Sequence, residues 1–483
     1  MARVLSALFF FGCFSLSHVI ADTDRLQEVF SWRQVDFVFP DQQIRQRAIN
    51  NREYIQANNL PLGLEVWRNK LFITVPRWKA GVASTLNYVN LDSNNRNRSP
   101  LLIPYPSYEM NRLPTSYERP VDHIINTFRL SVDKCDRLWA IDMGASNGTT
   151  VGEPQLFIFD LNRDRIVRQF TINQQLRNSE TWFPGLIVDS EPGACDRSFA
   201  YLPDIGYGLV VYSFQANQAW RIRHPYFYFD PLSSVFNMGG VRLVDWYDGV
   251  FGLALSERHS DGYRTLYFQA LASTRMFSVN TRLLQSNTST NAQNFEQFQH
   301  VGYRPSGMQA ASISMDESSG ALFFALVNQD AIGCWNPRRN QRHSMENSAI
   351  VAQDSTTLFF PSDLKVDSQS NFWVLSDRMP LFRFQVNRFD FNDVNYRVFT
   401  TPVSELIRGT VCESNGGSWN NGNGNVNNGF GHFNSGSGSF NNNNNNRGNN
   451  NNRGHNNRGN GYMRKSGNSN ENFNDNDNFN TGV

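Results

Sequence analysis

The sequence predicts an all-β chain folded as a six-bladed β-propeller, in which an N-terminal strand closes the ring. Three observations lead to this prediction. Short runs of aromatic and β-branched residues alternate with Gly, Pro, Asn and Asp, without a long amphipathic helix between them. One strand-like motif recurs along the chain, and one further strand-like segment precedes its first copy. A closed ring of blades explains all three, because closure leaves no end blade exposed.

The recurring motif is a short strand that follows a turn of charged or small polar residues. Its copies lie roughly 50 to 67 residues apart, above the usual 40 to 50 residues of a propeller blade, and loop insertions account for the excess. Two stacked β-sandwich domains are the rival architecture, but repeated copies of one motif fit it less well. The copies span residues 70–76, 137–143, 198–204, 265–271, 321–327 and 371–377.

The segment before the first motif contains two strand-like runs, at residues 26–32 and 35–39. A ring of blades closes only when the two ends of the chain are joined in one blade. Part of this segment is therefore expected to pair with the last blade near residues 396–399. A short helix is expected within residues 41–58.

The two ends of the chain are expected to lie outside the propeller, which takes residues 22–413. Residues 1–21 have the basic start, apolar run and small cleavage-site residues of a secretory signal peptide. The apolar run is about half of the roughly 20 residues that a membrane span needs. Residues 414–483 are rich in Asn and Gly, which predicts a disordered tail that acts as a spacer or as an adhesive segment. The mature protein is therefore expected to be secreted, extracellular and without a membrane partner.

The composition is that of a folded protein with a large core. Hydrophobic residues make up 40% of the chain, aromatic residues 13%, and the formal net charge is +1. Because a nucleic-acid-binding surface usually brings a large basic excess, no nucleic-acid partner is expected.

Four cysteines remain after the signal peptide, namely Cys135, Cys195, Cys334 and Cys412. An even number in a secreted chain predicts two disulfides, and the spacing leaves all three pairings open. No two of these cysteines have the short spacing of a zinc site, so neither a metal nor a cofactor is expected. The candidate N-glycosylation sites are Asn97, Asn147 and Asn287.

Five sets of residues carry a resemblance to a known family: 76–78 with 104–106, 133–139, 261–267, 332–335 and 373–379. Taken together they resemble the insect Yellow proteins, which are relatives of the major royal jelly proteins. The resemblance covers nearly the whole mature chain up to Cys412, and it excludes the Asn-rich tail.

This resemblance implies a secreted six-bladed propeller that acts in melanin pigmentation, cuticle and body colour. Some members of the family convert dopachrome, some relatives bind biogenic amines in the central cavity, and the royal jelly branch is nutritional. The fold alone therefore does not decide the function. The resemblance also implies the disulfide pairs Cys135–Cys195 and Cys334–Cys412.

Polar residues at the ends of the motif strands are the candidate ligand-binding residues, because the innermost strands of a propeller line its channel. An aromatic amine needs a carboxylate for its ammonium and an apolar wall for its ring. The resemblance implies that Ser362 and Asp377 occupy pocket positions. The alternative for each polar residue is a purely structural role as the cap of a turn. The polar candidates are Asp142, Asp204, Asn328, Ser376, Asp377 and Ser362 with Asp363, and the wall candidates are Met379 and Phe323 or Phe324.

An enzyme that converts dopachrome needs a group that removes a proton from the carbon bearing the carboxylate and a group that protonates the ring. Asp377 or Asp142 could serve as a half-buried general base. Arg77 or Arg378 could hold the substrate carboxylate, although each could equally make a structural bridge.

Two other chemistries are not expected. Residues 144–148 match the G-x-S-x-G pattern of a hydrolase, but no helix start follows them, so Ser146 is not expected to be a nucleophile. A calcium site built from the acidic strand ends has no supporting motif.

The sequence therefore predicts a secreted Yellow-family protein that acts in insect cuticle pigmentation and binds a catecholamine- or indole-type molecule in its central channel. The alternatives are a dopachrome tautomerase or decarboxylase and a non-catalytic structural, matrix or nutritional protein. The expected partner is a small aromatic amine or a melanin precursor, and the cuticle matrix is a further candidate.

Overall fold

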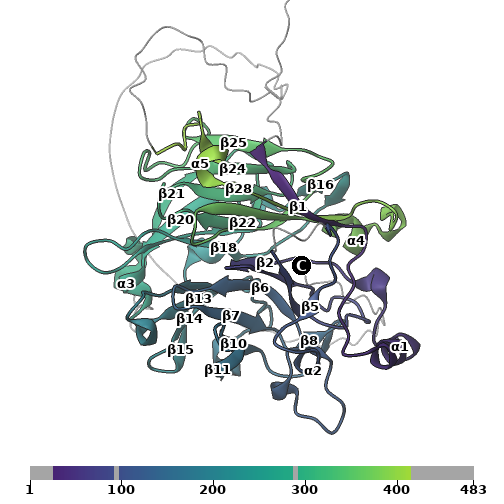
Figure 1. Cartoon of the computed structure of the whole chain (residues 1–483). Helices are drawn as coiled ribbons and strands as arrows, with labels where there is room; N and C mark the ends of the chain where they lie inside the picture. Colours follow the sequence, from purple (N-terminus) through teal and green to yellow (C-terminus); the bar gives the residue numbers. More distant parts are fainter. Residues whose placement is uncertain (1–24, 92–96, 287–291, 415–483) are drawn as a thin grey trace, which may run out of the picture. The chain divides into compact units, whose positions relative to one another are not determined.

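The computed structural model describes residues 25–91, 97–286 and 292–414 (Figure 1). The predicted signal peptide, the Asn/Gly-rich tail beyond Ser414 and the glycosylation candidate Asn287 lie outside the described residues. The described residues belong to one compact unit.

Six four-stranded antiparallel sheets form the blades, and their strands are given from the innermost outward. The first blade contains β2 (Leu64–Trp67), β3 (Lys70–Thr74), β4 (Leu86–Asn90) and β5 (Ile103–Pro104). The second contains β6 (Thr127–Val132), β7 (Arg137–Asp142), β10 (Gln155–Asp160) and β11 (Arg165–Thr171). The third contains β12 (Ile187–Asp189), β13 (Phe199–Asp204), β14 (Gly208–Ser213) and β15 (Gln218–Ile222).

The remaining blades follow the same order. The fourth contains β18 (Val250–Leu255), β19 (Thr265–Ala270), β20 (Arg275–Asn280) and β21 (Gln299–Tyr303). The fifth contains β22 (Ala310–Met315), β23 (Leu322–Leu326), β24 (Ala331–Trp335) and β25 (Ser348–Gln353). The sixth contains β26 (Pro361–Val366), β27 (Asn371–Ser376), β28 (Tyr396–Pro402) and β1 (Gln27–Trp32).

Within the described residues, two small hairpins and five short α-helices lie outside the six blade sheets. The hairpins are β8 (Ala145–Ser146) with β9 (Thr149–Thr150) and β16 (Phe236–Met238) with β17 (Val241–Leu243). The helices are α1 (Gln42–Asn50), α2 (Tyr108–Asn111), α3 (Thr281–Leu284), α4 (Met379–Phe384) and α5 (Val403–Ile407). The expected short helix within residues 41–58 is α1, which the side chain of Asp41 caps by accepting from the Ile44 amide.

The six sheets form a closed ring, as predicted. Each innermost strand contacts the innermost strand of the next blade, and β26 contacts β2. The N-terminal strand closes the ring, because β1 pairs with β28 as the outermost strand of the last blade. Phe30 lies opposite Val398 and Trp32 opposite Tyr396, which is the pairing region expected from the sequence.

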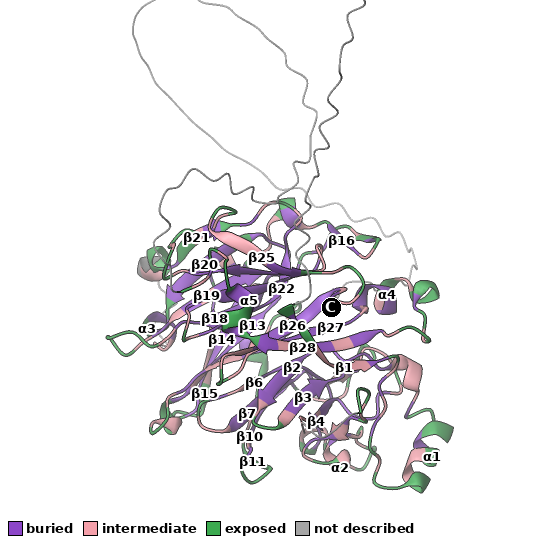
Figure 2. Ribbon diagram, turned by 45° about the horizontal axis from the view of Figure 1, so that its top comes forward, coloured by how far each residue is buried: buried purple, intermediate pink, exposed green. Residues whose placement is uncertain are grey.

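The recurring motif is the second strand of each blade, which corrects the expectation that it forms the innermost strand. The second strand has hydrogen-bonded neighbours on both sides, and β7 and β23 are buried along their whole length. Figure 2 shows many of the blade strands in purple, which marks buried residues. Four of the innermost strands, β6, β18, β22 and β26, carry a register shift against the second strand. A bulge breaks the alternation of apolar and polar residues, so these strands are harder to find in the sequence.

Apolar side chains fill the space between neighbouring blades. Phe323 lies in one such core, with its ring centroid 5.0 Å from that of Phe372, and it does not line the channel hollow described below.

Both disulfide pairs are confirmed: Cys135 is bonded to Cys195, and Cys334 is bonded to Cys412. The second bond joins β24 to the segment that follows the last blade.

Candidate functional site

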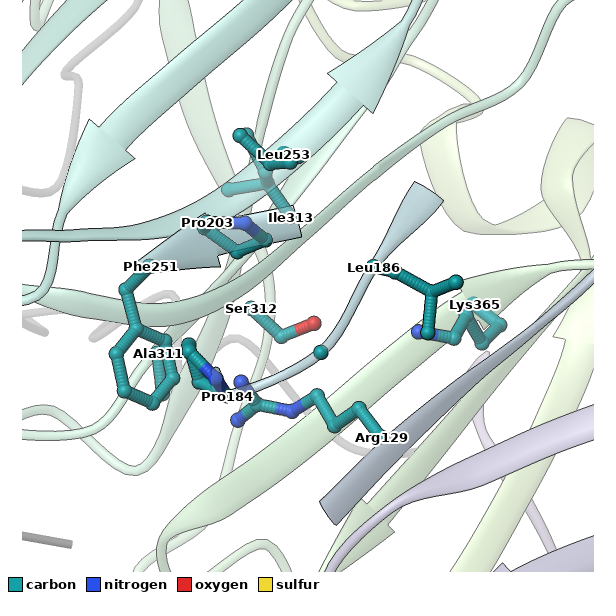
Figure 3. Close-up of a pocket in the computed structure, with 12 residues that line it drawn as sticks. Arg129, Pro184, Leu186, Pro203, Phe251, Leu253, Ala311, Ser312, Ile313 and Lys365 are labelled. Carbon is teal, nitrogen blue, oxygen red and sulfur yellow. The ribbon is translucent and has the colours of Figure 1, made fainter. Parts of the chain in front are cut away.

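A small hollow lies in the central channel, beside the middle residues of several innermost strands and the loop that leads into β12 (Figure 3). We call the end of the channel where the innermost strands begin the upper end. The hollow has an empty volume of about 310 Å³, which includes open solvent, whereas the volume that the centre of a water molecule can occupy is about 30 Å³, which is room for roughly two water molecules. The side chains around it include Arg129, Leu186, Phe251, Ser312 and Lys365. An aromatic ligand therefore has to use the open part of the hollow.

Two cations share one carboxylate beside this hollow. Arg129 Nε lies 3.2 Å and Lys365 Nζ 3.5 Å from Asp363 Oδ1. Asp363 is fully buried, and it also accepts from the Ser312 hydroxyl at 2.8 Å and from the Leu64 amide at 3.0 Å. Burial raises the pKa of the neighbouring Glu65 to about 7, although the charge of Lys365 opposes the shift. The centre of the channel therefore carries an excess of positive charge at neutral pH.

Four rings form an aromatic cluster next to the hollow: Trp78, Phe128, Trp182 and Phe251. Phe128 is central, with ring centroids 5.7 Å from Trp78 and 6.4 Å from both Trp182 and Phe251. The guanidinium of Arg129 lies 4.8 Å from the centre of the Phe251 ring. The buried indole N–H groups of Trp78 and Trp182 find no acceptor among the described residues. Because such groups are normally paired, they are available to a ligand that brings an acceptor.

Helix α4 of the last blade brings a further cation to the aromatic cluster. The guanidinium of Arg383 lies 5.0 Å from the Trp78 ring, and its Nε has no acceptor in the described part of the chain. Lys79 Nζ lies 3.7 Å from the centre of the Phe382 ring and donates to the Phe382 carbonyl. Burial lowers the pKa of both Arg383 and Lys79. The cluster is thus surrounded by donors rather than by acceptors.

The two predicted acidic candidates Asp142 and Asp204 cap turns of the fold. Asp142 accepts from the amides of Ile125, Asn126 and Gly144 at 2.8, 2.6 and 2.9 Å. Asp204 is equally occupied: it accepts at 2.7–3.0 Å from Thr181, Trp182 and Gly206 and pairs with Arg221. Each carboxylate joins the loop that enters its own blade to the end of the second strand. Asp204 therefore has no acceptor position left for a ligand or a metal ion, and Asp142, which is 1% exposed, keeps at most one.

Asp377 occupies the matching position in the last blade, but only half of its carboxyl group is used. Oδ1 accepts from the Met379 amide at 2.8 Å, whereas Oδ2 has no hydrogen-bond partner among the described residues. Burial raises the pKa of Asp377 to about 8, against smaller opposing effects of the Met379 amide, Ser362 and Arg129. Burial therefore favours the protonated form of Asp377 at neutral pH, whereas the positive charge of Arg129 favours the ionised form.

The other predicted residues lie elsewhere or are already paired. Ser362 donates to the Leu62 carbonyl, Ser376 to the Phe359 carbonyl, and Asn328 to Gln309. Met379 is buried at the start of α4, and Arg378 pairs with Asp393.

Arg77 requires a correction. Its guanidinium donates to the carbonyls of Val82, Ala83, Asn111, Ile124 and Ile125, and the side chain is fully buried. It is therefore not free to hold a substrate carboxylate. Burial lowers the pKa of Arg77 to about 10, so the carbonyl cage holds a cation at neutral pH.

Sequence reasoning missed Arg129, Lys365, Trp182 and Phe251, which come from innermost strands or the loops that lead into them. The sequence did contain an indication of where the channel-lining residues lie, because each innermost strand directly precedes a motif strand. Trp78 lies in residues 76–78, which carry part of the family resemblance, but the sequence indicated no role for its side chain.

Three further observations limit the chemistry. Among residues 25–91, 97–286 and 292–414, no group of three or more His, Cys, Asp or Glu side chains is placed to hold a metal ion. Ser146 lies in the hairpin of β8 and β9, not on a turn from a strand into a helix. In the same described ranges, no helix is long and apolar enough to cross a membrane.

We expect Asp377→Asn to change how stability depends on pH. The unfolded carboxyl group loses its proton near pH 4, whereas the folded group keeps it up to about pH 8. The wild type therefore loses up to about 1.4 kcal/mol of unfolding free energy per pH unit across this window, because the unfolded state binds fewer protons. Asparagine removes this contribution. Urea unfolding at pH 5, 6.5 and 8 checks the difference, and identical pH dependence of the two proteins would contradict a buried neutral Asp377.

The fold and the site define a six-bladed β-propeller with an aromatic, cation-rich upper channel end. The family model for the major royal jelly proteins matches residues 125–412. The chain belongs to this family, and the resemblance to Yellow and royal jelly proteins is confirmed. It is 39% identical over 395 residues to Protein yellow of Drosophila subobscura, a match that covers 80% of this chain and 67% of that protein. Protein yellow of Drosophila melanogaster is also 39% identical, over 80% of this chain and 71% of its own length.

Similarity to solved structures is weaker. A protein of unknown function from Bacteroides thetaiotaomicron aligns with a TM-score of 0.42 at 8% identity, over 78% of this chain and 75% of that chain. The PQQ-bound aldose sugar dehydrogenase from Streptomyces coelicolor aligns with a TM-score of 0.38 at 9% identity, over 78% and 97% of the two chains.

Proposed function

We propose that this Yellow-family protein is secreted and acts in cuticle pigmentation by binding an indole- or catechol-type melanin precursor at the upper end of its channel. One observation carries the proposal: the aromatic cluster borders the channel hollow and holds two buried indole N–H groups without acceptors in the described chain. Flat rings suit this cluster, because offset and edge-to-face ring contacts stabilise a complex beyond the area they bury.

The charges around the cluster favour a ligand that carries carboxylate or carbonyl oxygens. Arg129 and Lys365 share the carboxylate of Asp363, and Arg383 pairs with no carboxylate among the described residues. Asp377 is neutral below about pH 8. An ammonium group would therefore meet only the partly ionised Glu65 as a negative charge, and most of its desolvation would go uncompensated. We accordingly favour a melanin precursor with an acidic group over a simple amine.

An extracellular place of action is supported by the two disulfide bonds, which persist in oxidising compartments. The features of a signal peptide in residues 1–21 support it as well. The role in pigmentation is supported by the 39% identity to proteins that are named Protein yellow.

Asp377 favours a second candidate function, the conversion of dopachrome. A general acid or base works best when its pKa lies near the operating pH, and burial raises the pKa of Asp377 to about 8. Its Oδ2 has no partner among the described residues, but Asp377 is fully buried and does not line the hollow, so conversion requires that the substrate ring reach this oxygen. A protein that binds without turnover, or one with a purely structural role in a matrix, would make no use of this group.

Two ligands that share one ring and differ in charge test the proposal. Isothermal calorimetry is expected to show binding of indole-2-carboxylate at least about tenfold tighter than that of tryptamine. Trp182→Leu is expected to weaken the binding of indole-2-carboxylate about tenfold, since one wall of the site is lost. Trp220→Leu on the outermost strand β15 serves as the matched control and is expected to leave binding unchanged. Tighter binding of tryptamine, or equal effects of the two tryptophan variants, would contradict the proposed site.

A further inference from the structure

Five arginine side chains are buried in the described part of the chain: Arg77, Arg129, Arg137, Arg264 and Arg304. A guanidinium stays charged in proteins, so its removal from water has to be compensated. Three of them meet a carboxylate, in the pairs Arg129–Asp363, Arg137–Asp133 and Arg264–Asp189. Arg77 lies in the carbonyl cage described above. Arg304 meets no carboxylate among the described residues and has only two acceptor oxygens, against the five carbonyls around Arg77.

Arg304 is only 2% exposed and makes two hydrogen bonds. Its Nε donates to the Met308 carbonyl at 2.8 Å, and its Nη2 donates to Gln269 Oε1 at 2.7 Å. The Gln269 amide is fixed in this orientation, because its Nε2 donates to the Ala310 carbonyl. Nη1 has no acceptor, and no acidic side chain within the described ranges lies within 4 Å of the guanidinium. Burial lowers the pKa of Arg304 only to about 9, so it is a cation at neutral pH.

A buried histidine next to Arg304 is also incompletely paired. His343 is 1% exposed, and in the described structure neither its Nδ1 nor its Nε2 has a hydrogen-bond partner. Its backbone is fixed to β21, since the His343 amide donates to Val301 and the Tyr303 amide donates to the His343 carbonyl. Burial and the charge of Arg304 hold the pKa of His343 well below its usual value, so the ring is neutral and keeps one N–H donor.

The two side chains meet around one ring. The Arg304 guanidinium lies 5.1 Å and the His343 ring 5.4 Å from the centre of Phe324, and the other neighbour of His343 is Trp335, stacked at 4.9 Å. A cationic donor and a neutral donor, each without a partner in the described structure, thus lie beside one ring between the fourth and fifth blades. Neither residue lines the channel hollow or belongs to the aromatic cluster.

We propose that Arg304 Nη1 and the free N–H of His343 bind one halide ion, chloride under physiological conditions, between the fourth and fifth blades. A water molecule would satisfy hydrogen bonds but would leave the guanidinium charge uncompensated. A polyatomic anion such as sulfate has four oxygens and would need more hydrogen-bond donors than the two that are unpartnered here. The ion completes the compensation that carboxylates or carbonyls supply to the other four buried arginines.

Thermal unfolding of the full secreted protein tests the halide site. Sodium gluconate is replaced by sodium chloride or bromide at constant ionic strength. Because a ligand that binds only the folded state stabilises it, Tm is expected to rise by about 2 °C and to saturate. Arg304→Met is expected to abolish the rise. Arg137→Met, which removes another buried arginine, is expected to lower Tm but to keep the halide response.

A crystal grown in bromide provides a test that needs no variant. An anomalous peak is expected within hydrogen-bond distance of Arg304 Nη1 and His343. If Arg304→Met does not fold, His343→Phe replaces it in the unfolding experiment and is expected to reduce the halide response. A water molecule at the site without a halide-specific rise in Tm would overturn the proposal. A bromide peak without that rise would mark an adventitious ion and would overturn it as well.

Discussion

Trp32→Ala is expected to lower the free energy of unfolding by about 3–5 kcal/mol, the usual cost of truncating a fully buried tryptophan. Trp32 lies on the N-terminal strand β1, is 1% exposed and donates its indole N–H to the Pro100 carbonyl at 2.9 Å. It also packs against Phe30 on the same strand, at 5.6 Å between ring centroids. These contacts hold the strand that closes the ring, so their loss weakens the closure as well as the local packing.

Urea unfolding measures this effect, and Trp220→Ala is the matched control. Trp220 lies on β15, the outermost strand of the third blade, where it is half-buried and donates to the Leu284 carbonyl. A smaller loss is expected there, because β15 belongs to a blade made from one continuous stretch of chain. Equal losses in both variants would mean that the closing strand matters no more than any other outer strand.

Asp377→Asn is expected to slow dopachrome conversion about 10²–10⁴-fold if the second candidate function holds, which is the usual contribution of a general acid or base. Asparagine has nearly the shape of aspartic acid but cannot exchange a proton at neutral pH. The variant is expected to be as stable as the wild type or more stable near pH 8, since it avoids the buried carboxylate. A loss of rate in a stable protein would therefore report on proton transfer rather than on folding.

The decay of the dopachrome absorbance, followed from pH 6 to 9, measures this effect. A rate limb near pH 8 is expected in the wild type and is expected to vanish in Asp377→Asn. Wild-type protein that does not accelerate the decay would exclude conversion and leave the binding function alone. An unchanged rate in Asp377→Asn would remove Asp377 from any catalytic role.

The fold was largely predictable because one strand motif recurs along the chain. Each second strand is buried between two hydrogen-bonded neighbours, so its apolar character recurs along the chain, and the closing strand stood out as a strand without a blade. Four of the innermost strands were not recognised because bulges break their alternating pattern, as at Ala310–Ile313 in β22. The disulfide pairs followed from the family resemblance and not from the spacing.

The site was less predictable, because its chemistry depends on tertiary contacts that cannot be read from the identity of the residues. Asp142, Asp204 and Asp377 look alike in the sequence, yet backbone amides occupy the first two and leave Oδ2 of the third without a partner in the described chain. Arg77 is held by carbonyls that no sequence pattern reveals. The pair of Arg129 and Asp363 joins residues of two different blades, so only the closed ring brings them together.

A crystal structure of the protein with indole-2-carboxylate tests the central claim most directly. The account predicts that the indole ring lies against Trp78 and Trp182 at the upper end of the channel. It also predicts that the carboxylate lies within hydrogen-bond distance of Arg129 or Arg383. A ring bound at the other end of the channel or on the outer surface, with the aromatic cluster unoccupied, would contradict it.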